Sequence, residues 1–248
     1  MKGISKKVEE KRTKSQPDKV ICDERLAHIA FIMDGNGTWA KKRGLPRTAG
    51  HRAGAKSFKA LVEYLGTTGL KHMTVYAFST ENWSRPKEEV DAIMDLLDEY
   101  IEMAAKSFRK NNVRVIFLGD RTPLKESLRI KMDKLEKDTE NWDFILNIAI
   151  NYGSHDEIVR AVNKCIADGV ENVSAEDIEK RLDTRLSPHP DLIVRTGSEV
   201  RLSNFLLWQA QYAELYFTDT LWPDFDEKEA NKAITEFYKR KRKKGGLI

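Results

Sequence analysis

The feature that most constrains the fold is a regular alternation of short apolar runs with amphipathic segments, from about residue 27 onward. The apolar runs are predicted to be strands at 27–33, 72–79, 113–118, 143–150, 191–195 and 213–217. Several are apolar at consecutive positions, which is typical of strands buried on both faces of a parallel sheet. Helices are predicted between them, at 50–68, 87–110, 123–138, 154–168, 174–182 and 226–242.

This alternation predicts a single α/β domain built on a mostly parallel six-stranded sheet covered by helices. A chain of 248 residues suits one large domain, and no linker or repeat interrupts it after residue 24. We expect residues 1–24 to be a flexible charged arm, 25–242 to form the domain and 243–248 to be a basic tail.

Composition limits where the protein works. No apolar run approaches the roughly 20 residues that span a bilayer, and the N-terminus has no apolar signal segment. The two cysteines, Cys22 and Cys165, lie far apart, so a reducing cytoplasm is expected. Much of the net charge of +4 comes from the basic end after Lys239. That end is interpreted as a solvated tail, a peripheral contact with the inner face of the membrane, or a diphosphate ligand. No nucleic-acid-binding motif is present.

The first predicted strand runs directly into Asp34-Gly35-Asn36-Gly37. Ligands of parallel sheets bind beyond the carboxyl ends of the strands, and a glycine-rich turn before a helix offers backbone N–H groups to an anion. An aspartate there can hold Mg²⁺ against a diphosphate. Arg47 and His51 follow, four residues apart on one helix face. The alternative is an ordinary turn followed by a solvated basic helix start.

Five blocks of sequence carry a resemblance to a known family. They are HIAFIMDGNGTWAKKRGLPRTAGHRAG (28–54), YAFSTENWSRP (76–86), LNIAINYG (146–153), RTGSEVRLSNFLLWQ (195–209) and YAELYFTDTLWPDFDE (212–227). In this order they resemble the signatures of the cis-prenyltransferase family over residues 25 to 242. A trans-type prenyl synthase is not expected, because DDxxD motifs are missing and the predicted strands contradict an all-helical fold.

The resemblance implies a Mg²⁺-dependent homodimer that condenses isopentenyl diphosphate with an allylic diphosphate such as farnesyl diphosphate. The expected product is undecaprenyl diphosphate for the cell-wall lipid carrier. Two alternatives stay open: a divergent member that makes a shorter or irregular prenyl diphosphate, and a weakly active or non-catalytic homologue.

The resemblance also implies roles for individual residues. Expected catalytic residues are Asp34, His51 and Asn82. Expected metal ligands are Asp34 and Glu214. Expected substrate-binding residues are Gly35, Asn36, Gly37, Trp39, Arg47, His51, Ser79, Glu81, Asn82, Trp83, Arg85, Arg195, Arg201 and Ser203.

Three positions depart from the family pattern. Thr38, His155 and Lys243 stand where arginine is usual, so weaker diphosphate binding or altered chemistry is expected. Phe144 is bulky and shares a strand face with Ile148, and we hypothesise that it limits the length of the product.

Overall fold

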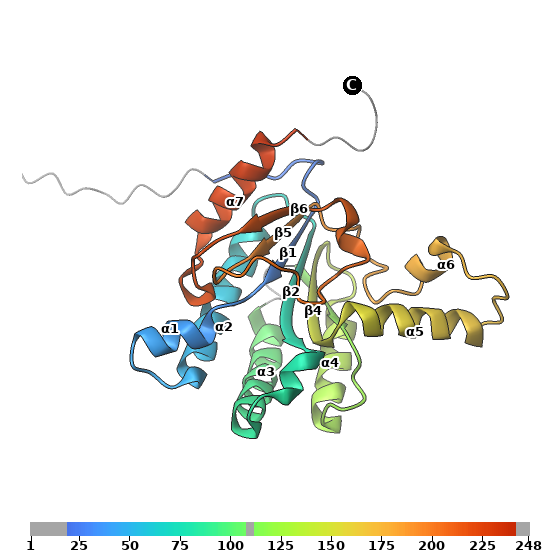
Figure 1. Cartoon of the computed structure of the whole chain (residues 1–248), viewed down its shortest axis with the longest axis horizontal. Coiled ribbons are helices and arrows are strands. Elements are labelled where there is room, and N and C mark those ends of the chain that lie inside the picture. Colours follow the sequence, from blue (N-terminus) through green and yellow to red (C-terminus); the bar gives the residue numbers. More distant parts are fainter. Residues whose placement is uncertain (1–18, 108–111, 242–248) are drawn as a thin grey trace, which may run out of the picture.

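The sheet of the computed structural model, which describes residues 19–107 and 112–241, confirms the α/β prediction (Figure 1). Its strands are β1 (His28–Ile32), β2 (His72–Ser79), β3 (Val113–Leu118), β4 (Phe144–Tyr152), β5 (Leu192–Arg195) and β6 (Glu214–Phe217). They lie in the order β3-β4-β2-β1-β5-β6, and every neighbouring pair is parallel. All of their carboxyl ends therefore meet at one edge of the sheet.

Helices fill the connections between the strands. They are α1 (Asn36–Lys42), α2 (Arg47–Leu65), α3 (Lys87–Ser107), α4 (Glu126–Thr139), α5 (Ser154–Ala167), α6 (Ala175–Glu179) and α7 (Glu227–Lys239). Short 3₁₀ turns form η1 (Thr80–Ser84), η3 (Gln209–Tyr212) and η4 (Trp222–Asp224). The helix expected at 50–68 begins earlier, at Arg47, because Pro46 is extended and supplies a natural helix start.

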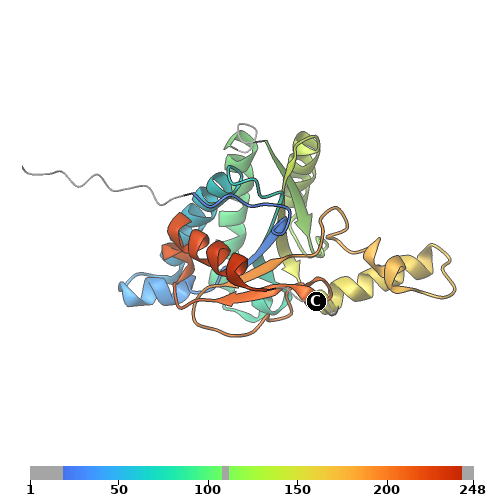
Figure 2. The ribbon, with the colours of Figure 1, turned by 90° about the horizontal axis from the view of Figure 1, so that it is seen from above.

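Alternation along the strands separates two cores. Ile29 and Phe31 of β1 pack in the larger core together with residues of α2, α3, α4 and α7. Ala30 and Ile32 point the other way, into a smaller cluster that includes Phe205. The segment that follows β5 therefore covers part of the second face. Helices α5 and α6 extend away from the body of the molecule (Figure 2).

Part of the expected N-terminal arm packs against the domain. Cys22 is buried, and its N–H donates to the carbonyl of Thr68. The N–H of Asp23 donates to the Tyr238 hydroxyl at 2.8 Å. Residues 1–18 and the expected tail at 243–248 lie outside the described residues. Among the described helices, none combines the length and apolarity that a bilayer span requires.

Candidate functional site

A polar cavity opens at the carboxyl ends of β1, β2 and β5. It offers about 970 Å³, counting the space open to solvent. The residues that line it are Ile32, Met33, Asp34, Gly35, Asn36, Gly37, Arg47, His51, Tyr76, Ala77, Ser79, Asn82, Arg85, Ile93, Arg195, Arg201 and Ser203. Most of the predicted site residues thus come together, as the strand-end rule requires.

Arg195, the last residue of β5, organises one side of this cavity. Its Nη1 donates to the carbonyl of Arg201 and, at 2.8 Å, to Oγ of Ser203. Its Nη2 donates to Oδ2 of Asp34 at 2.9 Å. The guanidinium is buried, and a buried charge is tolerated only when it is paired and hydrogen-bonded. Asp34 and the 201–203 turn are therefore held in a fixed relation.

The Asp34–Gly37 turn lies against α2, where Gly50 and Gly54 leave room for Asn36. Gly35 has a φ of +107°, which favours glycine, and its N–H donates to Oδ1 of Asp34 at 2.7 Å. A Cβ at Gly54 would lie 2.1 Å from Oδ1 of Asn36. That oxygen is buried and has no hydrogen-bond partner within the described chain. Asn36 lines both this polar cavity and a second, apolar cavity described below. Its Oδ1 can therefore accept a hydrogen bond from a ligand.

Glu89 of α3 gathers three cationic or basic side chains at the rim of the cavity. Its Oε1 lies 3.1 Å from Arg85 Nη1 and 3.5 Å from His51 Nε2, and its Oε2 lies 3.2 Å from Arg47 Nε. The His51 contact is too loose to count as a hydrogen bond. Burial lowers the pKa of His51 and Glu89 opposes that shift, so the ring is neutral at neutral pH.

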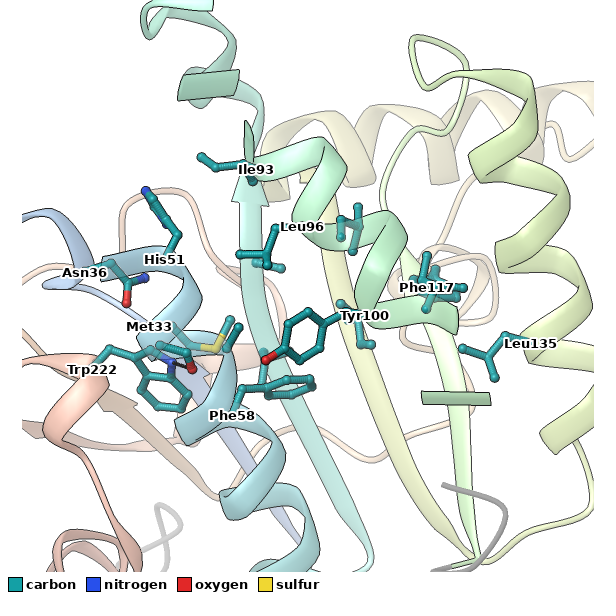
Figure 3. A pocket seen from close by; sticks show the side chains of 17 residues that line it. Met33, Asn36, His51, Phe58, Ile93, Leu96, Tyr100, Phe117, Leu135 and Trp222 are labelled. Carbon is teal, nitrogen blue, oxygen red and sulfur yellow. Dashed lines mark hydrogen bonds between the residues drawn. The ribbon is translucent and has the colours of Figure 1, made fainter. Parts of the chain in front are cut away.

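A second cavity, lined almost entirely by apolar side chains, lies between α2, α3 and the sheet (Figure 3). It offers about 770 Å³, again counting open space. Its members are Met33, Asn36, His51, Gly54, Ala55, Phe58, Val75, Ala77, Ile93, Leu96, Leu97, Tyr100, Ile101, Phe117, Leu135, Ile148 and Trp222. Five residues, Met33, Asn36, His51, Ala77 and Ile93, also line the polar cavity, so the two are continuous. Sequence reasoning did not find most of these residues, because apolar side chains of a cavity and of a core look alike.

Three predicted substrate-binding residues do not line either cavity. Trp39 donates its indole N–H to Asp224 at 2.7 Å. Glu81 accepts a hydrogen bond from Asn204 at 3.1 Å. Trp83 donates to Oδ1 of Asn151 at 2.7 Å and packs edge-on against Phe78.

Glu214 does not lie near Asp34 within the described chain. It begins β6, where it pairs with Leu192, and Leu192 pairs with Ile29 of β1. Asp34 lies five residues beyond Ile29, which is about 16 Å at ~3.3 Å per residue. Glu214 instead accepts from Nη1 of Arg240 at 2.8 Å. The described residues contain no group of three or more His, Cys, Asp or Glu side chains that could hold a metal.

The positions that depart from the family pattern are exposed or lie outside the described chain. Thr38 is exposed on α1, and His155 is exposed at the start of α5. Neither lines the polar cavity. Lys243 lies outside the described residues. Phe144, at the start of β4, packs near Gly66 and is not among the residues that line the apolar cavity, whereas Ile148 on the same strand face is.

A polar, cation-rich cavity joined to an apolar one defines a protein that binds amphiphilic anions. Residues 32–245 match the family model described as "Putative undecaprenyl diphosphate synthase". The isoprenyl transferase of Fusobacterium nucleatum is 54% identical over 221 residues, 89% of this chain and 96% of that protein. The Pasteurella multocida ditrans,polycis-undecaprenyl-diphosphate synthase, (2E,6E)-farnesyl-diphosphate specific, is 46% identical over 88% of this chain and 94% of that protein.

Two solved structures are also similar to this chain. A probable undecaprenyl diphosphate synthase from Campylobacter jejuni has a TM-score of 0.77 at 38% identity, covering 89% of this chain and 99% of that one. Lavandulyl diphosphate synthase from Lavandula x intermedia, in complex with dimethylallyl diphosphate, has a TM-score of 0.85 at 30% identity, covering 90% and 100%. This chain belongs to the undecaprenyl diphosphate synthase family. It is a prenyltransferase.

Proposed function

We propose that this protein extends an allylic diphosphate, with farnesyl diphosphate as primer, by repeated addition of isopentenyl diphosphate to give undecaprenyl diphosphate. The observation that carries this proposal is the continuity of the two cavities. A polyprenyl diphosphate has a doubly charged head and a long apolar chain. The polar cavity supplies arginines and backbone N–H groups for the head, and the apolar cavity takes the chain.

In the reaction that we propose, the allylic C–O bond breaks and its electron pair stays on the departing diphosphate. The alkene of isopentenyl diphosphate forms the new C–C bond, and the resulting cation loses a proton. Arg47, Arg85 and the Gly35–Gly37 turn stabilise charge on the departing group. Arg195, Arg201 and Ser203 hold the second diphosphate. Neutral His51, which lines the same cavity as Asn82, can accept a proton.

Mg²⁺ fits this site only in partnership with a substrate. Asp34 offers one carboxylate, and no second acidic side chain lines the described cavity. Magnesium is commonly held by one or two carboxylates with phosphate oxygens and water completing its octahedron. We therefore propose Asp34 as the protein ligand, and Mg²⁺, when bound, stabilises negative charge on the diphosphate.

The assembly and location of the protein follow from the same assignment. We propose a cytoplasmic homodimer that contacts the inner face of the membrane only peripherally, where the apolar product is delivered for cell-wall lipid carrier synthesis. Glu214, placed by this fold away from Asp34, keeps a metal role only if a second subunit brings diphosphate to it.

The test uses the purified full chain, labelled isopentenyl diphosphate, Mg²⁺ and either geranyl or farnesyl diphosphate, with products sized by mass. A ladder ending at undecaprenyl diphosphate, lost with EDTA and in Asp34→Ala, is expected. No elongation with either primer would refute the proposal.

One observation favours a second candidate, a single irregular condensation. The lavandulyl diphosphate synthase structure matches this fold at a TM-score of 0.85, and Thr38 replaces the usual arginine on α1. The same assay with dimethylallyl diphosphate as the only substrate distinguishes the two. A single short product in place of a ladder would favour the irregular reaction.

A further inference from the structure

Asn204 lies where three segments of the chain meet. Its side-chain Nδ2 donates to Oε1 of Glu81 at 3.1 Å. Its Oδ1 accepts from the N–H of His155 at 3.1 Å, and its backbone carbonyl accepts from the N–H of Ser154 at 2.8 Å. One side chain thus connects η1, the start of α5 and the turn after Arg201. Nothing in the sequence pattern singled it out.

The turn that carries Asn204 has an unfavourable backbone. Ser203, Asn204 and Leu206 have φ values of +50°, +61° and +47°. Left-handed conformations are costly for residues other than glycine, and asparagine and aspartate tolerate them best. Such a turn persists only when its surroundings hold it. Its conformation matters because Ser203 Oγ and the Arg201 carbonyl both accept from Arg195.

Glu81 connects the same point to the other side of the cavity. It lies in η1 between Ser79 and Asn82, whose backbone N–H and side-chain Oδ1 are hydrogen-bonded to each other at 3.1 Å. Burial raises the pKa of Glu81, but hydrogen bonds from its own backbone and from Asn204 outweigh that effect and lower it. The carboxylate is therefore ionised and is a strong acceptor.

The chain leaves space for this contact at Gly153. A Cβ on Gly153 would lie 2.6 Å from Nδ2 of Asn204 and 2.9 Å from Oγ1 of Thr80. Both distances are shorter than real Cβ contacts allow. Any larger residue there would push Asn204 away from η1.

We propose that the Asn204–Glu81 hydrogen bond sets the distance between the 79–85 segment and the 195–203 segment, which makes Asn204 a positioning residue. This inference rests on the proposed function, in which the two segments bind the diphosphate groups of two substrates. A C–C bond must then form between these substrates. A small misplacement of reacting groups lowers the rate strongly, although neither side chain touches the substrates.

The test exchanges donor and acceptor. Asn204→Asp keeps the shape, tolerates the left-handed backbone and can still accept from His155. It cannot donate to Glu81, and two carboxylates then face each other. Asn204→Asp/Glu81→Gln restores the bond in the opposite direction, because glutamine donates to aspartate. Asn163→Asp, on an exposed position of α5, is the matched control for the added charge.

We expect Asn204→Asp to lower kcat/KM for isopentenyl diphosphate at least tenfold, with the double variant recovering most of it and Asn163→Asp retaining full activity. Unchanged kinetics in Asn204→Asp would overturn the proposal. So would a double variant as impaired as the single one, or a fall in Tm that accounts for the loss.

Calorimetric titration with inorganic diphosphate separates this inference from the proposed function. If the wild-type protein elongates no primer, the proposed function fails. The positioning role then stands only if diphosphate binding is weakened in Asn204→Asp and restored in the double variant, and it falls if the three proteins bind alike.

Discussion

Arg195 is the side chain on which the geometry of the polar cavity depends most. It is 4% exposed, and its two terminal nitrogens reach Asp34, Ser203 and the Arg201 carbonyl. A lysine ammonium is a point charge and cannot span these partners. We expect Arg195→Lys to reduce kcat/KM by about a hundredfold, ~2.7 kcal/mol of transition-state stabilisation. Steady-state kinetics of condensation measure it.

The matched control is Arg181→Lys, because Arg181 pairs with Asp168 and Asp177, and none of the three lines either cavity. Equal losses in the two variants would mean that the effect is one of general stability. Full activity in Arg195→Lys would show that the fork geometry is unimportant.

The surroundings of Asp34 lead to a prediction about metal binding. Oδ1 and Oδ2 already accept from Gly35 and Arg195, and no other carboxylate lines the described cavity. We expect Mg²⁺ alone to show no saturable binding up to millimolar concentration, and binding to appear once inorganic diphosphate is added. Isothermal titration calorimetry checks this. In Asp34→Asn we expect the diphosphate-dependent binding of Mg²⁺ to be lost. Tight binding of Mg²⁺ to the free protein would contradict a single-carboxylate site.

At the scale of elements, α2, α3, α4 and the sheet line the apolar cavity that takes the growing chain in the proposed function. Figure 3 shows His51 and Asn36 at one end of the lining, with Phe117 and Leu135 at the other. Leu135, from α4, is 2% exposed and lies at that end. We expect Leu135→Ala to lengthen the main product, since it removes side-chain volume where the growing chain must stop. Mass analysis of the products measures the shift.

Phe144→Ala is the comparison for this prediction. Phe144 is also buried, at 6% exposure, but it lies outside the lining. Both variants lose core packing, about 2–5 kcal/mol each, so any difference in product length reflects position and not stability. Longer products from Phe144→Ala alone would reverse the assignment.

The same elements show what sequence could and could not provide. Six apolar runs were enough to predict the strands, although their burial differs: all five residues of β1 are buried, whereas every residue of β6 is only partly buried. The strand-end rule located Asp34, Ser79 and Arg195. Applied consistently, it would also have placed Glu214 and Phe144, the second residues of their predicted strands, at the opposite edge. The family resemblance outweighed it for Glu214.

Other features depend on contacts between distant segments, which no local pattern encodes. The direction of Trp83 is set by Asn151, 68 positions away. The partner of Glu81 is Asn204, 123 positions away. The strand order also depends on contacts between distant segments, because β1 lies between β2 and β5.

At the scale of the whole molecule, a buried polar chain crosses the middle of the sheet. Asn147 Nδ2 donates to Thr74 Oγ1 at 2.9 Å, and Thr74 lies 2.7 Å from Nε2 of His28. His28 Nδ1 lies 2.7 Å from the carbonyl of Pro188, so Nδ1 carries the proton and Nε2 accepts from the Thr74 hydroxyl. A proton on Nε2 would leave that hydroxyl hydrogen without its acceptor. Burial lowers the pKa of His28 to about 4.

This pKa predicts a loss of stability in mild acid. The pKa of His28 is about 4 in the folded protein and 6.5 in the unfolded chain, so the unfolded chain binds more protons between these values. Stability therefore rises with pH through this window and is lost as pH falls from 6.5 towards 4. From pH 7 to pH 5 we expect His28 to remove about 2 kcal/mol of unfolding free energy.

Burial also lowers the pKa of His51 and His72, which act in the same direction, whereas it raises the pKa of Glu157, which acts in the opposite one. The measurement is therefore a difference: urea unfolding at pH 5 and pH 7 for the wild type and for His28→Gln, whose side chain does not titrate. The variant is expected to be less stable at pH 7 and to lose about 2 kcal/mol less on acidification. Parallel pH dependences for the wild type and His28→Gln would show that the sheet tolerates a charged His28.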